Sequence, residues 1–374
     1  MSSSSPGHGL APYDALLLVS FGGPEAPEEV MPFLRQVTGG RGIPEERLTE
    51  VAGHYLAFGG RSPINDQCRD LLAALRAELA GRGLELPLYW GNRNTAPWLG
   101  ETMAEIARDG HRRVLAITTS AYPSYSSCRQ YRENLWDAWS PVAAAGTELQ
   151  VDRVRNYAQH PGFVDANLAA VREAVERLSD EVPHLLFVTH SLPTAMAETA
   201  GPPPRSETGS YVDWHQSVAQ EITWQLRQET GVAHPFDLVY CSRSGPPSQP
   251  WLEPDINDRM AELAAAGVRS VVVAPIGFVS DHMEVVFDLD TEARETAEEL
   301  GLRMERAATA GTHPAFVSGL VDLALERAAV ARGEPAAPSV IEGGSPGLVV
   351  CPVGCCPNLR EPGRPALCGA VAPG

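Results

Sequence analysis

Three carboxylates recur at every fourth position in one segment of the chain. Glu284, Asp288 and Glu292 lie within FVSDHMEVVFDLDTEARE, residues 278–295. Residues four apart share one face of a helix, so a helix here would stack three like charges in a row. Such a row costs stability unless a cation binds to it, and oxygen ligands suit divalent metals. The spacing therefore indicates either a track for a divalent metal or a solvated acidic face.

A histidine stands at the end of an apolar run in the same half of the chain. His190 ends the run HLLFVTH and is followed by Ser-Leu-Pro. An imidazole in this place can accept a proton near neutral pH or ligate a borderline metal. A histidine that is satisfied within a core or loop is the alternative interpretation.

Four of the seven cysteines crowd into residues 351–374. Cys351, Cys355 and Cys356 lie within six residues, and either Cys128 or Cys368 could supply a fourth thiol. Outside an oxidising compartment, clustered thiols indicate metal ligands rather than disulfides. Four thiolates suit a [2Fe-2S] cluster or a structural zinc, and the spacing leaves the metal open.

The elements that must position these residues alternate along the chain. Apolar, strand-like runs alternate with amphipathic segments, which is typical of a parallel α/β sheet. Strands are expected near residues 15–20, 86–91, 113–119, 149–153, 184–189, 236–241, 269–275 and 302–305. Helices are expected, among others, at residues 65–80, 99–109, 160–179 and 256–266.

The two halves of the chain resemble each other. DALLLVSFGGP at 14–24 is similar to HLLFVTHSLP at 184–193, and two further pairs of segments match in the same order. The chain is therefore predicted to form two similar doubly wound, Rossmann-like parallel-sheet domains, with the active-site cleft between them at the carboxyl ends of the strands. We expect a flexible leader at residues 1–12 and an N-terminal Rossmann-like domain at 13–155. We expect a C-terminal Rossmann-like domain at 156–330 and a Pro/Gly-rich tail with the cysteine cluster at 331–374.

The charge and the apolar runs exclude several classes of protein. With 29 basic and 47 acidic residues, the net charge is −18, which disfavours nucleic acid or an anionic membrane as a partner. The apolar runs are far shorter than the ~20 residues of a membrane-spanning helix. The first residues lack the basic and apolar regions of a secretory signal. We therefore expect a cytoplasmic protein without an integral membrane segment, and a monomer.

Taken together, the motifs resemble the ferrochelatase family. They match in order from about residue 14 to about residue 325, and they are LLLVSFGGP, YLAFGGRSPIN, GNRNTAPW, SAYPSYSSCRQYREN, FVTHSLP, QPWLEP and PIGFVSDHMEVVFDLDTEA. The resemblance implies an enzyme that inserts Fe²⁺ into a porphyrin during haem synthesis. It also implies a cleft between two similar doubly wound domains.

The resemblance implies roles for individual residues. His190 matches the active-site histidine, which takes pyrrole protons or ligates the metal, and Glu284 matches a glutamate that faces it across the porphyrin. Asp288 and Glu292 match acidic residues that lead toward the surface. The implied porphyrin contacts are Arg93, Trp251 and Phe278 along the macrocycle, with Ser62 and Tyr125 near the propionates.

Two positions depart from the pattern of the family. Phe21 stands where some bacterial relatives have a tyrosine that can ligate the metal. Arg41 is the arginine of VTGGRG, a stretch in which related bacterial enzymes carry several arginines. The axial ligand and the recognition of the propionates are therefore expected to differ here.

The cysteines and the amino-acid residues of the motifs indicate a branch of the family. A subset of ferrochelatases carries a [2Fe-2S] cluster with one internal ligand and three in the tail, which implies Cys128, Cys351, Cys355 and Cys356. The motifs look most like the actinobacterial branch, which implies coproporphyrin III as the substrate. Protoporphyrin IX is the alternative substrate. A non-catalytic tetrapyrrole or haem carrier is the competing function, and it would need the cleft but not the acidic row.

Overall fold

Two four-stranded parallel sheets form the framework of the computed structural model, which describes residues 9–39, 42–178, 181–207, 209–245 and 248–367. The strand orders, β2-β1-β3-β4 and β6-β5-β7-β8, correspond strand for strand. The first sheet consists of β1 (Ala15–Ser20), β2 (Leu88–Asn92), β3 (Arg113–Thr118) and β4 (Gln150–Arg153). The second consists of β5 (His184–His190), β6 (Phe236–Cys241), β7 (Ser270–Ala274) and β8 (Arg303–Arg306). This arrangement confirms the predicted pair of similar parallel-sheet units.

Buried apolar runs account for the strands. Every residue of β1 and of β7 is buried, because helices cover both faces of a parallel sheet. Each predicted strand matches an observed strand, and the ends differ by no more than two residues.

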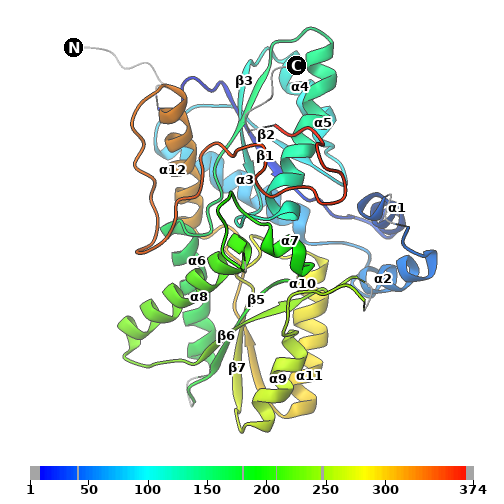
Figure 1. The fold of residues 1–374 in the computed structure, drawn as a ribbon, viewed down its shortest axis with the longest axis vertical. Coiled ribbons are helices and arrows are strands. Elements are labelled where there is room, and N and C mark those ends of the chain that lie inside the picture. The colour runs from blue at the N-terminus through cyan, green and yellow to red at the C-terminus, as the bar shows by residue number, and fades with distance from the viewer. Residues whose placement is uncertain (1–8, 40–41, 179–180, 208, 246–247, 368–374) are drawn as a thin grey trace.

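Helices connect the strands and surround the two sheets (Figure 1). Those of the first half are α1 (Pro27–Thr38), α2 (Glu45–Ala57), α3 (Ile64–Gly81), α4 (Leu99–Arg108) and α5 (Gln130–Ala144). Those of the second half are α6 (Pro161–Arg177), which contacts β7 and β8, and α7 (Thr194–Glu198), α8 (Gly209–Thr230), α9 (Ile256–Ala265), α10 (Met283–Phe287), α11 (Ala293–Leu300) and α12 (Pro314–Ala331). The four helices predicted above are confirmed as α3, α4, α6 and α9. None of the helices in the described ranges is long and apolar enough to cross a bilayer.

A wider helical turn follows the third strand of each sheet. The π-helix η1 (Tyr125–Arg129) leads into α5, and the π-helix η2 (Asp288–Glu292) joins α10 to α11. In such a turn each backbone N–H group donates to the carbonyl oxygen five residues earlier in the chain, rather than four. The helix predicted over the acidic row is therefore present, but its π turn was not predicted.

The last helix returns to the first sheet. α12 packs against α3 and β3 as well as α6. Arg82, just beyond α3, donates hydrogen bonds to the side chains of Asp322 and Ser318 on α12, and both donor–acceptor distances are 2.6 Å. Leu10 is fully buried, so the packed structure extends into the range 1–12 that was expected to be a leader.

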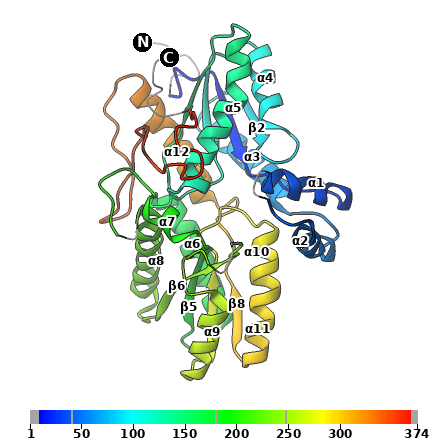
Figure 2. The same cartoon turned by 45° about the vertical axis from the view of Figure 1, so that its right-hand side comes forward.

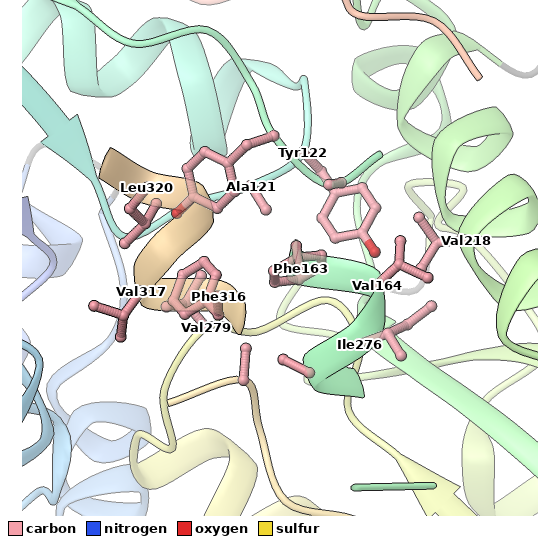
Figure 3. Close-up of a cluster of buried hydrophobic side chains, with 14 of the residues drawn as sticks. Ala121, Tyr122, Phe163, Val164, Val218, Ile276, Val279, Phe316, Val317 and Leu320 are labelled. Carbon is pink, nitrogen blue, oxygen red and sulfur yellow. The ribbon is translucent and has the colours of Figure 1, made fainter. Parts of the chain in front are cut away.

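One apolar cluster joins the two halves. It contains Tyr122 after β3, Phe163 on α6, Ile276 after β7 and Phe316 on α12 (Figure 3). The ring of Phe163 lies edge-on to Tyr122 and to Phe316, with centroids 6.0 and 5.7 Å apart. Edge-to-face contacts at these distances add to the gain from burial. The two halves therefore pack against each other through a shared core, in addition to being linked by the polypeptide chain.

The tail is held against the first half by buried arginines. Arg155 donates to the carbonyl oxygens of Ser339 and Pro346, and Arg132 donates to that of Leu367. Figures 1 and 2 show the tail passing over the half of the molecule that contains the first sheet. Over residues 332–367 the tail has neither helix nor strand, so these side-chain contacts fix its course.

Candidate active site

His190 and Glu284 lie together at the carboxyl end of the second sheet. His190 is the last residue of β5, and Glu284 lies in the first turn of α10, which follows β7. The distance from Nε2 of His190 to Oε2 of Glu284 is 3.6 Å. Nδ1 of His190 is hydrogen-bonded to the carbonyl oxygen of Ser191. Because a carbonyl only accepts, Nδ1 carries the hydrogen and Nε2 can take a proton or a metal ion.

The separation of these two groups overturns one expectation from the family resemblance. A flat ring between two groups needs a van der Waals contact on each side, about 7 Å in all. The 3.6 Å between His190 and Glu284 leaves no such space. The expectation that Glu284 faces His190 across a porphyrin is therefore wrong for this structure. Both groups lie on the same side of any ring in the cleft.

The acidic row leads away from this pair. In an α-helix each step of four residues advances by about 400°, so such a row drifts by about 40° per step. The π turn from Asp288 to Glu292 holds more residues per turn and reduces this drift. In the described ranges, no three His, Cys, Asp or Glu side chains are placed to hold a single metal ion. The row is therefore a line of successive carboxylates and not a closed chelate.

Asp288 is the most perturbed member of the row. Burial, followed by the charges of Glu284 and Glu292, raises its pKa to about 7, whereas a hydrogen bond from the Ser242 hydroxyl opposes this rise. Ser242 follows β6 with a φ of 61°, a backbone conformation that is unfavourable for residues other than glycine. Near pH 7 the Asp288 carboxyl is thus divided between its neutral and ionised forms. Sequence reasoning had assigned no role to Ser242.

Helix α2 of the first half covers the acidic row. The His54 ring stacks on Phe287, with centroids 3.7 Å apart and planes 6° apart. Met283, next to Glu284, packs into the apolar cluster of α1 and α2 with Phe33 and Tyr55. More than half of the chain separates the two segments, so no local pattern could reveal this contact.

The loop before α10 is fixed from both halves of the molecule. Arg306 forms ion pairs with Asp281 at 3.2 Å and with Asp290 at 2.6 Å. Gln67 on α3 donates to Oδ2 of Asp281 at 3.3 Å and accepts from its backbone N–H at 2.8 Å. Gln67 therefore ties the first half to the loop that carries Glu284.

Three of the predicted porphyrin contacts meet at the carboxyl edge of the first sheet. Phe21 comes directly after β1, at the position that corresponds in the duplication to His190, the last residue of β5. The Arg93 guanidinium lies 5.3 Å from the centroid of the Phe21 ring and 4.4 Å from that of Tyr131. Ser62 is buried against Gly23, where an added Cβ would come within 2.7 Å of the Ser62 Cβ. Glycine at this position therefore permits the close approach.

Two further predicted contacts lie beside the histidines of the second half. The backbone of Trp251 bridges to Pro193, three residues beyond His190, and the Trp251 Nε1–H is buried without a hydrogen-bond partner among the described residues. Phe278 meets the His282 ring edge-on, with centroids 5.0 Å apart. Phe278 therefore lies next to His282, whose Nδ1 is 4.0 Å from Oε2 of Glu284, and the Trp251 backbone lies beside the segment that follows His190.

Among the described residues, the predicted contact Tyr125 is not joined to this group. The Tyr125 hydroxyl donates to Oε2 of the buried Glu133 at 3.2 Å, and Glu133 in turn pairs with Arg129. These bonds connect Tyr125 with the region of the tail. Arg41 lies outside the described residues.

Four cysteines form a separate buried cluster. They are Cys128 on η1 and Cys351, Cys355 and Cys356 in the tail. The sulfur atoms of Cys355 and Cys356 are 3.8 Å apart. Arg153 donates to the Cys128 sulfur at 3.2 Å, and the Gly201 N–H donates to that of Cys356 at 3.1 Å. The structure thus gathers the four cysteines that the resemblance implied, whereas Cys368 lies outside the described residues.

The environment of the cluster favours a thiolate at Cys128 and Cys355, whereas hydrogen bonds to these two cysteines and burial raise the pKa of the Cys351 and Cys356 thiols. Hydrogen bonds from Cys351 and Cys356 hold the pKa of the Cys128 thiol well below its usual range, and the charges of Arg153 and Arg132 act in the same direction. Thiolates are the form that binds iron or zinc.

The comparison with known families agrees with the family resemblance of the motifs. The family model described as ferrochelatase matches residues 13–328 of the chain. The chain belongs to the ferrochelatase family. Curated ferrochelatase relatives match over nearly the whole length. The coproporphyrin III ferrochelatase of Streptomyces coelicolor is 54% identical, covering 97% of this chain and 98% of its own length. That of Leifsonia xyli is 50% identical, covering 96% of this chain and 94% of its own.

Among solved structures, the chain aligns with SirB from Bacillus subtilis with Fe³⁺. It aligns with this ferrochelatase at a TM-score of 0.48 and 11% identity, over 85% of this chain and 97% of the other.

Proposed function

We propose that this ferrochelatase inserts Fe²⁺ into coproporphyrin III, a step of haem biosynthesis. The observation that carries the proposal is the His190–Glu284 pair, 3.6 Å apart at a strand end, with the acidic row leading away from it. A non-catalytic carrier would need no such row. The two relatives named above are both coproporphyrin III ferrochelatases, which favours this substrate over protoporphyrin IX.

The reaction exchanges one Fe²⁺ for the two pyrrole protons of the free-base porphyrin. We propose that Fe²⁺ first exchanges water ligands for Nε2 of His190 and the carboxylate of Glu284. When the ring nitrogens take the metal, these two groups become free bases at the place where two protons are released. The imidazolium that results lies beside a carboxyl group. Two protons therefore have two acceptors on one face of the ring.

The acidic row supplies the iron in this proposal. Glu292, Asp288 and Glu284 offer successive carboxylates, which bind Fe²⁺ weakly enough to release it to the next site. The ring lies against Phe21 and Arg93 on one side and Trp251 and Phe278 on the other. Walls that bend the ring expose the lone pair of a pyrrole nitrogen, so binding energy supports the distortion that insertion needs.

We propose that the cysteine cluster holds a [2Fe-2S] centre, in which four thiolates are shared between two irons, so that no three cysteines need to surround one ion. Its four thiols are buried together, and a guanidinium and a backbone N–H donate to two of the sulfur atoms. Cys128 and the three tail cysteines would hold the group, which would supply one-electron chemistry and a cross-link between η1 and the tail. The cluster is separate from the His190–Glu284 pair, so we assign it a structural or regulatory role.

The assay that tests the function compares two porphyrins under anaerobic conditions. Fe²⁺ insertion into coproporphyrin III and into protoporphyrin IX is followed by the shift of the Soret band. We expect turnover with coproporphyrin III and little with protoporphyrin IX. The reverse preference would overturn the substrate assignment, and binding of both without metallation would support the carrier. We further expect a monomer of about the chain mass, 40.1 kDa, that acts in the cytoplasm without nucleic acid.

The cluster is tested by its spectrum. We expect the purified protein to absorb in the visible range and Cys355→Ser to remove that absorption, because one of four ligands is lost. Cys68→Ser is the matched control, since Cys68 is also buried but hydrogen-bonds to Ser20 outside the cluster. Equal spectra in the two variants would contradict the assignment.

A further inference from the structure

A cavity of about 390 Å³ lies at the free edge of the first sheet, beneath the tail. β4, the edge strand, forms one wall, and Val349, Val350 and Leu367 of the tail form the opposite wall. Trp139 of α5 also lines it. None of the cleft residues described above lines this cavity, so it is separate from the proposed porphyrin site. Its volume lies within the range of small-molecule sites.

The wall of the cavity carries an excess of positive charge. Arg113, Arg153 and Arg327 line it, together with a single carboxylate, Asp152. In the whole chain the balance is the opposite, with 47 acidic and 29 basic residues. Like charges gathered in a partly buried place repel one another unless an anion offsets them.

The partners of the arginines show where an anion would bind. Arg327 pairs with Asp152 at 2.8 Å, and Asp152 also accepts from the Tyr13 hydroxyl. Arg153 donates to the Cys128 sulfur. The Nε of Arg113 is buried without a hydrogen-bond partner, and its guanidinium forms no ion pair with the described residues. A buried donor without an acceptor costs about 1–3 kcal/mol, and more when it is charged, which a ligand oxygen would recover.

We propose that this cavity is a binding site for a small organic anion. A carboxylate or phosphate group of the ligand would accept hydrogen bonds from Arg113, in the fork geometry that a guanidinium offers. Leu149, Val349 and Leu367 would contact the apolar part of the ligand. Because the tail forms one wall, the bound anion would fasten the tail to β4.

Calorimetric titration of the full chain tests the site. The probes are citrate and glycerol 3-phosphate, with inorganic phosphate and uncharged glycerol as comparisons, all at constant ionic strength. We expect saturable binding of at least one organic anion with a 1:1 stoichiometry, and Arg113→Gln should weaken it at least tenfold. Arg112→Gln is the matched control, because Arg112 is the exposed neighbour, does not line the cavity, and has a guanidinium that donates to the carbonyl of His111.

Two further measurements keep the test decisive if Arg113→Gln does not fold. Val350→Trp adds volume at a residue that is 49% exposed, and it should block binding while the protein stays folded. Bound coproporphyrin should leave the affinity for the anion unchanged. The proposal is overturned by binding of phosphate alone, by equal losses in the two arginine variants, by competition with the porphyrin, or by the absence of saturable binding.

Discussion

His190 and Glu284 come from different elements, and each has an atom free to act on the same ligand. The hydrogen bond from Nδ1 to the Ser191 carbonyl fixes the tautomer and leaves Nε2 available. This detail could not be read from the sequence, which placed His190 at a strand end and, through the family resemblance, in the active site. The carboxylates were identified from their spacing, but their position on the same side as His190 depends on the fold.

Replacement of His190 tests the role of its free nitrogen. His190→Ala should lower the rate of Fe²⁺ insertion about 10²-fold or more, the typical contribution of a positioned base. Porphyrin binding, measured by fluorescence titration, should change little. His111→Ala, which removes a histidine outside the cleft, should turn over normally. Turnover near the normal rate in His190→Ala would refute the assignment.

The raised pKa of Asp288 predicts how the use of iron depends on pH. A carboxyl with a pKa of about 7 is mostly protonated at pH 6 and mostly ionised at pH 8, so its ionised fraction rises about tenfold between them. Only the ionised form is a good ligand, so the KM for Fe²⁺ should fall as the pH rises through 7.

Two variants test whether Asp288 causes this dependence. Asp288→Asn should flatten the pH profile of the KM for Fe²⁺. Ser242→Ala should move the transition to higher pH, because the Ser242 hydrogen bond favours the ionised carboxylate. A profile that is unchanged in both variants would assign the pH dependence to another group.

The helical segment from α10 to α11 acts as one element that carries the acidic row. The four-residue spacing was sufficient to predict a helix and a shared face. It was not sufficient to predict η2, because an α-helix and a π turn both satisfy that spacing within one turn. The contacts of the row with Ser242 and His54 come from distant parts of the chain and leave no local pattern.

The loss of insertion rate on replacing a carboxylate should depend on where that residue lies along this helical segment. Glu284→Gln should slow insertion more than Glu292→Gln, because Glu284 is next to His190 and Glu292 lies two turns away. Steady-state rates at low Fe²⁺ concentration measure the difference. Equal losses would show that the row is not a path with an inner and an outer end.

Contacts between the two halves hold the cleft together in the whole molecule. The duplication predicted two similar parallel sheets, since each half repeats the same apolar pattern, but it did not predict their strand order. It could not predict the shared core of Figure 3, because packing between repeats depends on tertiary structure. The hydrogen bonds between Gln67 and Asp281 could not be predicted either, because they also depend on how the two halves pack.

Loss of the hydrogen bonds between Gln67 and Asp281 should affect catalysis more than stability. Gln67→Met keeps the size of the side chain but removes both hydrogen bonds to Asp281. We expect kcat/KM to fall several-fold because Glu284 is positioned less firmly, with a small change in melting temperature. Gln228→Met, at an exposed site on α8, is the control. An equal effect of the two substitutions would contradict a positioning role.

The return of α12 to the first sheet has a consequence for how the protein is made. A ribosome releases β1 to β4 long before Pro314–Ala331, yet this helix contacts α3 and β3 and is hydrogen-bonded by Arg82. The nascent first half therefore exposes apolar surface until α12 has been synthesised. A gene fragment that encodes the first half alone should yield an aggregation-prone product, because the helix that covers it is encoded more than 150 residues after β4.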